Sequence, residues 1–138
     1  MASPTNESPI RTFGRREGHR LSPRKQRLFS DLLPRLRPDL DAPPPDSLDA
    51  LFAGPVSEVW LEVGFGAGEH LLWQARENPQ AGIIGCEPFI NGVASLLGSL
   101  DEANPGNVAI WDGDAREILG WLGDASLSRV FVLHPDPW

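Results

Sequence analysis

The sequence contains one cysteine and three histidines among its 138 residues. The single thiol, Cys86, excludes an internal disulfide and a cysteine-rich metal site, and its apolar neighbours predict a buried, inert side chain. His19, His70 and His134 lie far apart without metal-ligand spacing, so no metal site is predicted. No run of about 18 apolar residues is present, and residues 1–20 lack the apolar core of a signal peptide. These absences predict a cytoplasmic protein with a single core domain.

Positive charge is scarce and unevenly distributed. The formal net charge is −7, yet residues 1–37 carry nine of the twelve Arg and Lys residues and only three of the nineteen acids. Residues 1–20 therefore predict a basic, flexible arm suited to nucleic-acid phosphates, with Arg15 and Arg16 as candidate substrate-binding residues. Charge alone leaves an equal alternative, a disordered arm that only aids solubility.

Residues 21–55 predict a helix followed by a proline-rich linker. Ser22 is the expected N-cap, and Pro23 suits the first helical position. Apolar residues then recur at helical spacing, and Pro34 is expected to end or kink the helix. A second, short helix is expected at 47–52.

Residues 56–138 predict alternating strands and helices. Strands are expected at 56–63, 82–86, 108–111 and 130–133, with helices at 69–78, 89–103 and 115–122. This order is typical of an α/β fold of the Rossmann-like kind, with a parallel sheet of about four strands covered by helices on both faces. Ligands bind such sheets at the carboxyl ends of the strands, so 56–138 is the predicted ligand-binding domain.

Three glycines follow the first predicted strand at alternate positions: Gly64, Gly66 and Gly68. Glycine adopts positive φ and lets a ligand approach the backbone at the start of a helix. A dinucleotide-binding protein requires the spacing G-x-G-x-x-G, which is absent here. Glu62 before the glycines and Glu69 after them disfavour a diphosphate and favour a cationic ligand such as S-adenosylmethionine. A dehydrogenase is the less favoured alternative.

A carboxylate stands at the end of each predicted strand: Glu62, Glu87, Asp114 and Asp136. Glu87 has the position and spacing of an acid that binds ribose hydroxyls. Asp114 is a candidate for the adenine edge, or for the N-cap of the helix at 115–122, for which Asp112 is also available. Asp136 is held between two prolines, next to Trp138.

These motifs make residues from about 10 to 138 resemble the bacterial tRNA (guanine-N7-)-methyltransferase family. The motifs that carry the resemblance are Phe13-Gly14-Arg15-Arg16, Leu21-Ser22, the run from Glu62 to Glu69, Asn78-Pro79, Gly85-Cys86-Glu87-Pro88, Gly113-Asp114-Ala115 and Pro135-Asp136-Pro137-Trp138. The resemblance implies a class I methyltransferase fold and methyl transfer from S-adenosylmethionine to N7 of a guanine in the tRNA variable loop.

The resemblance also implies roles for individual residues. The implied cofactor-binding residues are Glu62, Gly64, Gly66, Gly68, Glu87, Asp114 and Asp136. Asp136 is in addition the implied catalytic residue, and Arg15, Arg16 and Trp138 are the candidates for binding the tRNA.

The chain departs from the family pattern at its end. Members of the family continue beyond the tryptophan with a basic run and further elements, so this chain is expected to be a C-terminally incomplete member. His134 stands where the family usually has phenylalanine. Two alternatives stay open: another S-adenosylmethionine-dependent methyltransferase, and a non-catalytic remnant that binds cofactor or RNA.

Overall fold

A computed structural model describes residues 18–124 and 126–132 of the chain. The elements are, in chain order, α1 (Pro23–Asp31), α2 (Leu33–Leu36), the 3₁₀ helix η1 (Leu48–Leu51), β1 (Glu58–Val63), α3 (Glu69–Glu77), β2 (Ala81–Cys86), α4 (Ile90–Glu102), β3 (Val108–Trp111), α5 (Ala115–Leu122) and β4 (Arg129–Val132). The predicted elements are all present, with bounds that differ by a few residues at most. The last expected strand position, residue 133, lies outside the described residues.

The four strands form one parallel sheet in the order β3-β2-β1-β4. The register pairs Val63 with both Cys86 and Val132, and pairs Cys86 with Trp111. The four strands therefore end at one level, and the loops that follow them share one rim of the sheet. The chain moves outward from β1 to β3 and then crosses back to the far side of β1, which makes the β1/β4 boundary the switch point where such sheets bind ligands.

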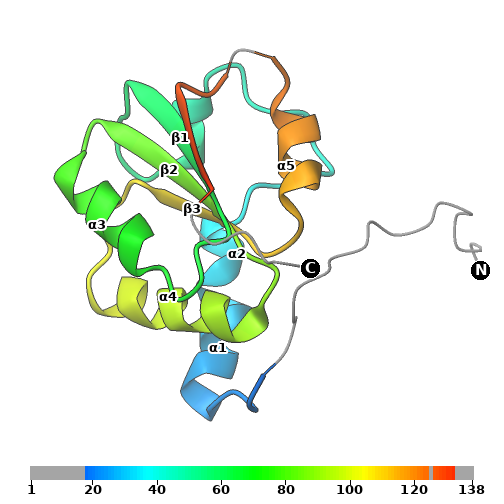
Figure 1. Ribbon diagram of the computed structural model, residues 1–138, viewed down its shortest axis with the longest axis vertical. Coiled ribbons are helices and arrows are strands. Elements are labelled where there is room, and N and C mark those ends of the chain that lie inside the picture. The colour runs from blue at the N-terminus through cyan, green and yellow to red at the C-terminus, as the bar shows by residue number, and fades with distance from the viewer. Residues whose placement is uncertain (1–17, 125, 133–138) are drawn as a thin grey trace, which may run out of the picture.

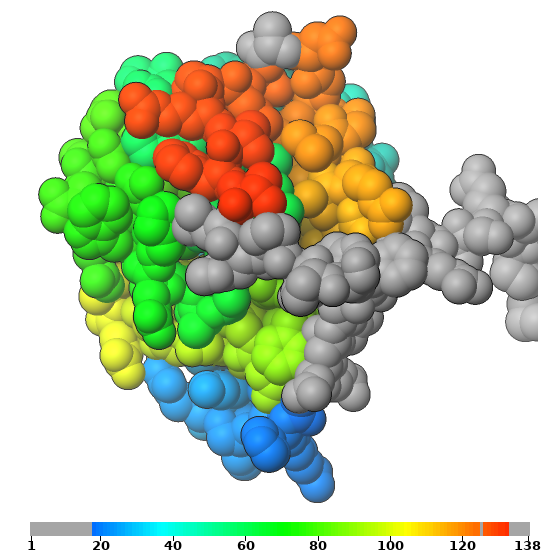
Figure 2. Space-filling view, viewed as in Figure 1, coloured from blue at the N-terminus to red at the C-terminus, as the bar shows by residue number. Residues whose placement is uncertain are grey.

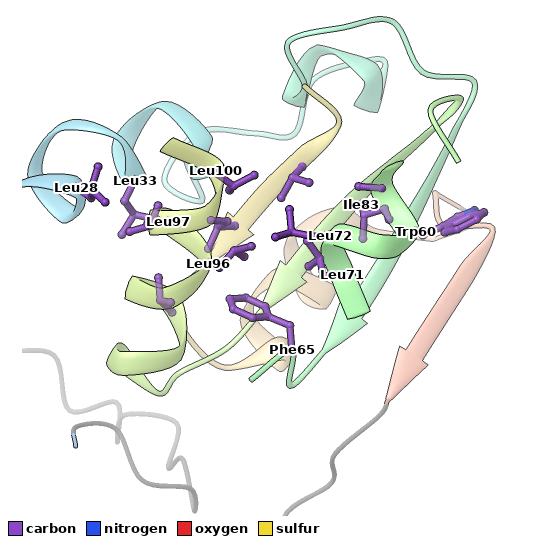
Figure 3. Close-up of a cluster of buried hydrophobic side chains, with 14 of the residues drawn as sticks. Leu28, Leu33, Trp60, Phe65, Leu71, Leu72, Ile83, Leu96, Leu97 and Leu100 are labelled. Atoms are coloured by element: carbon purple, nitrogen blue, oxygen red, sulfur yellow. The ribbon is translucent and has the colours of Figure 1, made fainter. Parts of the chain in front are cut away.

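Helices cover both faces of this sheet, as predicted (Figure 1). On one face α1, α3 and α4 bury the larger apolar cluster, in which Phe65, Leu71 and Leu96 point into the same space (Figure 3). On the other face α5 and the segment around η1 bury a second cluster around Leu61 and Ile84, both of which are fully buried. Burial on two faces explains why the central strands are almost continuously apolar rather than alternating.

The N-terminal helix packs along α4 rather than on the sheet. Figure 2 shows α1, in blue, against the yellow and yellow-green atoms of α4. Ser22 accepts a hydrogen bond from the Lys25 N–H at 3.3 Å, which confirms the predicted N-cap. The helical path breaks at Leu32, and the short α2, with Pro34 in its first turn, follows at once. The predicted kink at this proline is thereby confirmed, since its ring cannot continue an unbroken helix.

The edge strand β4 is only partly covered. Val130 and Val132 are 52% and 57% exposed, whereas Phe131 packs against the larger cluster. In the described part of the chain, no helix is both long and apolar enough to cross a bilayer.

Candidate functional site

The three predicted glycines form a tight turn between β1 and α3. Gly64, Gly66 and Gly68 have φ values of 73°, 63° and 91°, a region that residues with a Cβ rarely adopt. A Cβ at Gly68 would lie 2.7 Å from the Leu96 Cδ1 atom, so the turn also packs tightly against α4. At Gly66 no atom of the described residues lies within 4 Å of the position of a Cβ. The side of Gly66 that a Cβ would occupy is therefore open to an approaching ligand.

Glu62 lies at the end of β1 immediately before this turn and is completely buried. Its Oε1 atom is 2.6 Å from the Nδ1 atom of His70, in the first turn of α3. Burying a carboxylate is costly unless it is hydrogen-bonded or paired with a cation. A negative group held at this depth, beside an open turn, suits a ligand that carries positive charge.

Glu87 follows β2 and braces the glycine turn from the adjacent strand. Its Oε1 atom accepts a hydrogen bond from the Gly66 N–H at 2.8 Å, and its Oε2 atom accepts one from the Phe89 N–H at 3.1 Å. Sequence reasoning predicted a role for Glu87 in ligand binding but not this bracing. The carboxylate thus joins the turn to the start of α4 while its oxygens keep further lone pairs.

Gly92, in the first turn of α4, was not predicted as a site residue. A Cβ at this position would overlap the carbonyl oxygen of Gly66. The absence of a side chain lets α4 approach the backbone of the turn, which holds the turn between Glu87 and α4. A glycine inside a helix costs about 1 kcal/mol relative to alanine, and that cost was the signal available in the sequence.

Asp114 caps α5, which is one of its two predicted roles. Its Oδ1 atom accepts a hydrogen bond from the Arg116 N–H at 2.8 Å, while the Asp114 N–H donates to the Glu117 Oε1 atom at 3.0 Å. The Arg116 guanidinium donates to both carboxylate oxygens of Asp114. Hydrogen bonds from this side chain are the main reason that the pKa of Asp114 lies below the usual carboxyl value.

The other candidate cap, Asp112, is used differently. Its Oδ1 atom accepts a hydrogen bond from the Arg37 Nε atom at 2.6 Å, and the Arg37 guanidinium also stacks 4.3 Å above the Trp111 ring. Asp112 therefore ties the segment after α2 to the end of β3, and Asp114 alone caps the helix.

The predicted burial of the Cys86 thiol is confirmed, and its inertness stays a prediction. Cys86 is 1% exposed at the end of β2, and burial raises the pKa of its thiol well above the usual value. The carbonyl of Cys86, by contrast, accepts the Gly64 N–H at 2.8 Å and helps to shape the turn.

The structure thus brings together five of the predicted site residues: Glu62, Gly64, Gly66, Gly68 and Glu87. Asp114 lies on the same rim, after β3 at the outer edge of the sheet. Asp136, Trp138, Arg15 and Arg16 lie outside the described residues, so their roles stay predictions. Across the described ranges, no group of three or more His, Cys, Asp or Glu side chains is arranged to hold a metal ion.

Comparisons with known proteins give this rim a chemical context. The chain is 50% identical over 126 residues to a protein of Rhodopseudomonas palustris (strain BisB18) named tRNA (guanine-N(7)-)-methyltransferase. The aligned region covers 91% of this chain and 50% of that relative. A Brucella abortus (strain 2308) protein with the same name is 51% identical over 126 residues, covering 91% of this chain and 54% of the relative. The chain thus spans about half the length of the curated relatives it matches.

One solved structure, described as an antibiotic related methyltransferase, superposes with a TM-score of 0.52 at 18% identity, over 61% of this chain and 44% of that chain. At this identity the likeness concerns the fold alone. It confirms the predicted Rossmann-like class I methyltransferase fold.

The family model described as "Putative methyltransferase" matches residues 57–138. The match takes in every strand of the sheet as well as the glycine turn, and it sets aside the dehydrogenase alternative. Because this region makes up more than half of the chain, the protein belongs to that methyltransferase family, as the resemblance of its motifs predicted.

Proposed function

We propose that the protein transfers a methyl group from S-adenosylmethionine to N7 of a guanine in tRNA, which would make it a cytoplasmic tRNA-modifying enzyme. The observation that carries this proposal is the identity of about half of all aligned residues with proteins of that name.

The residues at the rim fit the proposed methyl donor. S-Adenosylmethionine supplies a methyl group on a sulfonium and also carries an ammonium, a ribose and an adenine. The buried carboxylate of Glu62 offers negative charge for the cationic end, because charge-assisted hydrogen bonds are the stronger ones. Gly66 leaves room next to the backbone. The remaining lone pairs of Glu87 are suited to ribose hydroxyls.

The acceptor requires little chemistry from the protein. N7 of guanine presents a lone pair and no proton on the major-groove edge of the base, so no general base is needed. The protein's residues would contribute by alignment, which is worth about 7–11 kcal/mol when ideal. Asp136, as the proposed catalytic residue, would accept hydrogen bonds from the guanine and stabilise the positive charge that develops on it. Trp138, Arg15 and Arg16 are the proposed tRNA contacts.

The experiment is a product analysis with the 138-residue chain, unmodified tRNA transcript and methyl-labelled S-adenosylmethionine. Formation of 7-methylguanosine, identified by mass spectrometry of the digested tRNA, is the expected result. Asp136→Ala should abolish the product while tRNA binding stays nearly unchanged. Glu77→Gln, an exposed change at the far end of α3, is the matched control and should leave the rate unaltered.

Cofactor binding without 7-methylguanosine would count against the proposal and favour a binding remnant. A methylated product at another atom or on another substrate would favour a different methyltransferase.

A further inference from the structure

The side chain of Asn91 holds the chain at the end of the basic arm. Asn91 is the second residue of α4. Its Oδ1 atom accepts a hydrogen bond from the Gly18 N–H at 2.6 Å, and its Nδ2 atom donates to the His19 carbonyl oxygen at 2.6 Å. One amide side chain thereby pairs with both a backbone donor and a backbone acceptor, as a neighbouring strand would.

Close packing supports this pair of hydrogen bonds. A Cβ at Gly18 would lie 3.0 Å from the Phe89 Cζ atom and 3.1 Å from the Asn91 Oδ1 atom, so the missing side chain lets the backbone reach the amide. Phe89 in turn donates its N–H to Glu87, which belongs to the site at the rim.

The first turn of α4 therefore has two neighbours at once. Gly92 packs against the carbonyl of Gly66 in the glycine turn, and Asn91, the adjacent residue, binds Gly18 and His19. The end of the arm and the glycine turn are consequently held by consecutive residues of one helix.

Segments further along the chain have their own attachments to α4. The Arg24 guanidinium donates to the Asp101 carboxylate at 3.0 Å, and Leu28 is buried in the larger apolar cluster. Loss of the Asn91 contacts would therefore release the chain before α1 without detaching α1 itself. The predicted phosphate-binding residues Arg15 and Arg16 precede Gly18 by three and two positions. Because each residue spans at most about 3.6 Å of chain, an anchor at Gly18 limits how far from α4 they can reach.

We propose that Asn91 is a positioning residue for tRNA: by binding Gly18 and His19 next to the glycine turn, it gives the arginines that precede them a fixed point of attachment near the methyl donor. This inference rests on the proposed function, and it adds a residue and a task that the motifs did not indicate. Positioning of this kind lowers the ordering cost of binding without adding any phosphate contact.

The test compares Asn91→Ala with the wild-type chain and with a chain lacking residues 1–17. Apparent tRNA affinity is measured by fluorescence anisotropy between 50 and 200 mM salt, together with S-adenosylmethionine affinity by calorimetry. Asn91→Ala should weaken tRNA binding about three- to tenfold, the size expected for one or two hydrogen bonds, and leave the salt slope unchanged. The truncated chain should lose affinity and also show a shallower slope, because phosphate contacts themselves are removed.

Two further measurements separate positioning from a general structural effect. Cleavage by trypsin after Arg20 should accelerate in Asn91→Ala, whereas the unfolding transition in urea should stay within experimental error of wild type. Ser99→Ala is the matched control on the same helix, since among the described residues its hydroxyl donates to the Ser95 carbonyl within α4.

The outcomes distinguish the two proposals. If wild type binds tRNA and Asn91→Ala equals it in affinity and trypsin sensitivity, the assignment of Asn91 is overturned and the proposed function stands. If wild type binds S-adenosylmethionine but no tRNA, both proposals are overturned.

Discussion

The Nδ1 atom of His70 lies 2.6 Å from the Oε1 atom of Glu62, and this contact joins the first turn of α3 to the end of β1. The Glu62 side chain is 1% exposed and that of His70 is 35% exposed, so the imidazole connects a buried carboxylate to the surface. The His70 ring also meets Phe131 of β4 edge-on, with 5.9 Å between ring centroids. The pair therefore sits at the boundary between β1 and β4, where the strand order changes direction.

Replacing Glu62 by glutamine keeps the shape of the side chain and removes its charge. Glu62→Gln should weaken S-adenosylmethionine binding by roughly 10- to 100-fold, because a hydrogen bond to a charged group is worth about 1.5–3 kcal/mol. Isothermal titration calorimetry measures the change, with Glu77→Gln as the control of equal charge. Unchanged affinity would show that the cationic end of the ligand binds elsewhere.

Removing the imidazole should destabilise the fold itself. His70→Ala takes a hydrogen-bond partner from the buried Glu62 carboxylate, and the expected loss is about 1–2 kcal/mol in the free energy of unfolding. Urea denaturation followed by tryptophan fluorescence measures it. Glu77→Ala, at the exposed end of the same helix, should stay within about 0.5 kcal/mol of wild type. Equal effects of the two variants would rule out a structural role for the His70 contact.

Two glycines within helices differ in the space around them, so replacing each by alanine should have a different effect. Gly92→Ala places a methyl group on the carbonyl oxygen of Gly66, so the turn must move, and cofactor binding should fall at least tenfold. A Cβ at Gly120, in the last turn of α5, meets no atom of the described residues within 4 Å, so Gly120→Ala should stabilise the protein by about 0.5–1 kcal/mol through helix propensity. Calorimetry and urea denaturation test both variants, and normal cofactor binding by Gly92→Ala would contradict the close approach.

The cap of α5 predicts a stability that depends on pH. The pKa of Asp114 is lower in the folded state than in an unfolded chain, where it is about 3.9. Its stabilising contribution is therefore fully present above about pH 4 and is lost as the pH falls through the folded-state pKa. Asp114→Ala should cost about 1 kcal/mol at pH 7 and less at pH 3, as measured by urea denaturation at the two pH values.

Arg116→Ala separates the cap from the ion pair at the same position. The variant keeps the backbone N–H that Asp114 accepts, so its cost at pH 7 should be clearly smaller than that of Asp114→Ala. If the two variants were equally destabilised, the guanidinium rather than the cap would account for the role of Asp114.

Burial of Cys86 predicts chemical inertness. The thiolate is the reactive form, and burial raises the pKa of this thiol, so an aromatic disulfide reagent at pH 8 should react very slowly with the folded protein. In urea the same reagent should titrate one thiol per chain, which the absorbance of the released product measures. Reaction of the folded protein at the rate of free cysteine would contradict the burial.

Local sequence signals determined much of the architecture. The alternation of apolar runs and helical periodicity predicted the order of strands and helices, because burial on two faces leaves continuous apolar strands. Ser22-Pro23 predicted the start of α1, and the glycines at 64, 66 and 68 predicted the turn, since both depend on the backbone geometry of those residues alone. The family itself was also predicted from short motifs.

Only the tertiary structure decided which side chains these elements bring together. The contact of Glu62 with His70 depends on how the glycine turn sets α3 against the end of β1, and that of Glu87 with Gly66 depends on the pairing of β1 with β2. The contacts of Asn91 with Gly18 and His19 depend on the packing of α4 against the start of the chain. An acidic residue that follows a strand has the same local sequence pattern whether it binds a ligand, caps a helix or braces a turn. The choice among those roles follows from its neighbours in space, which can be distant in the sequence: Arg37, the partner of Asp112, is 75 positions away.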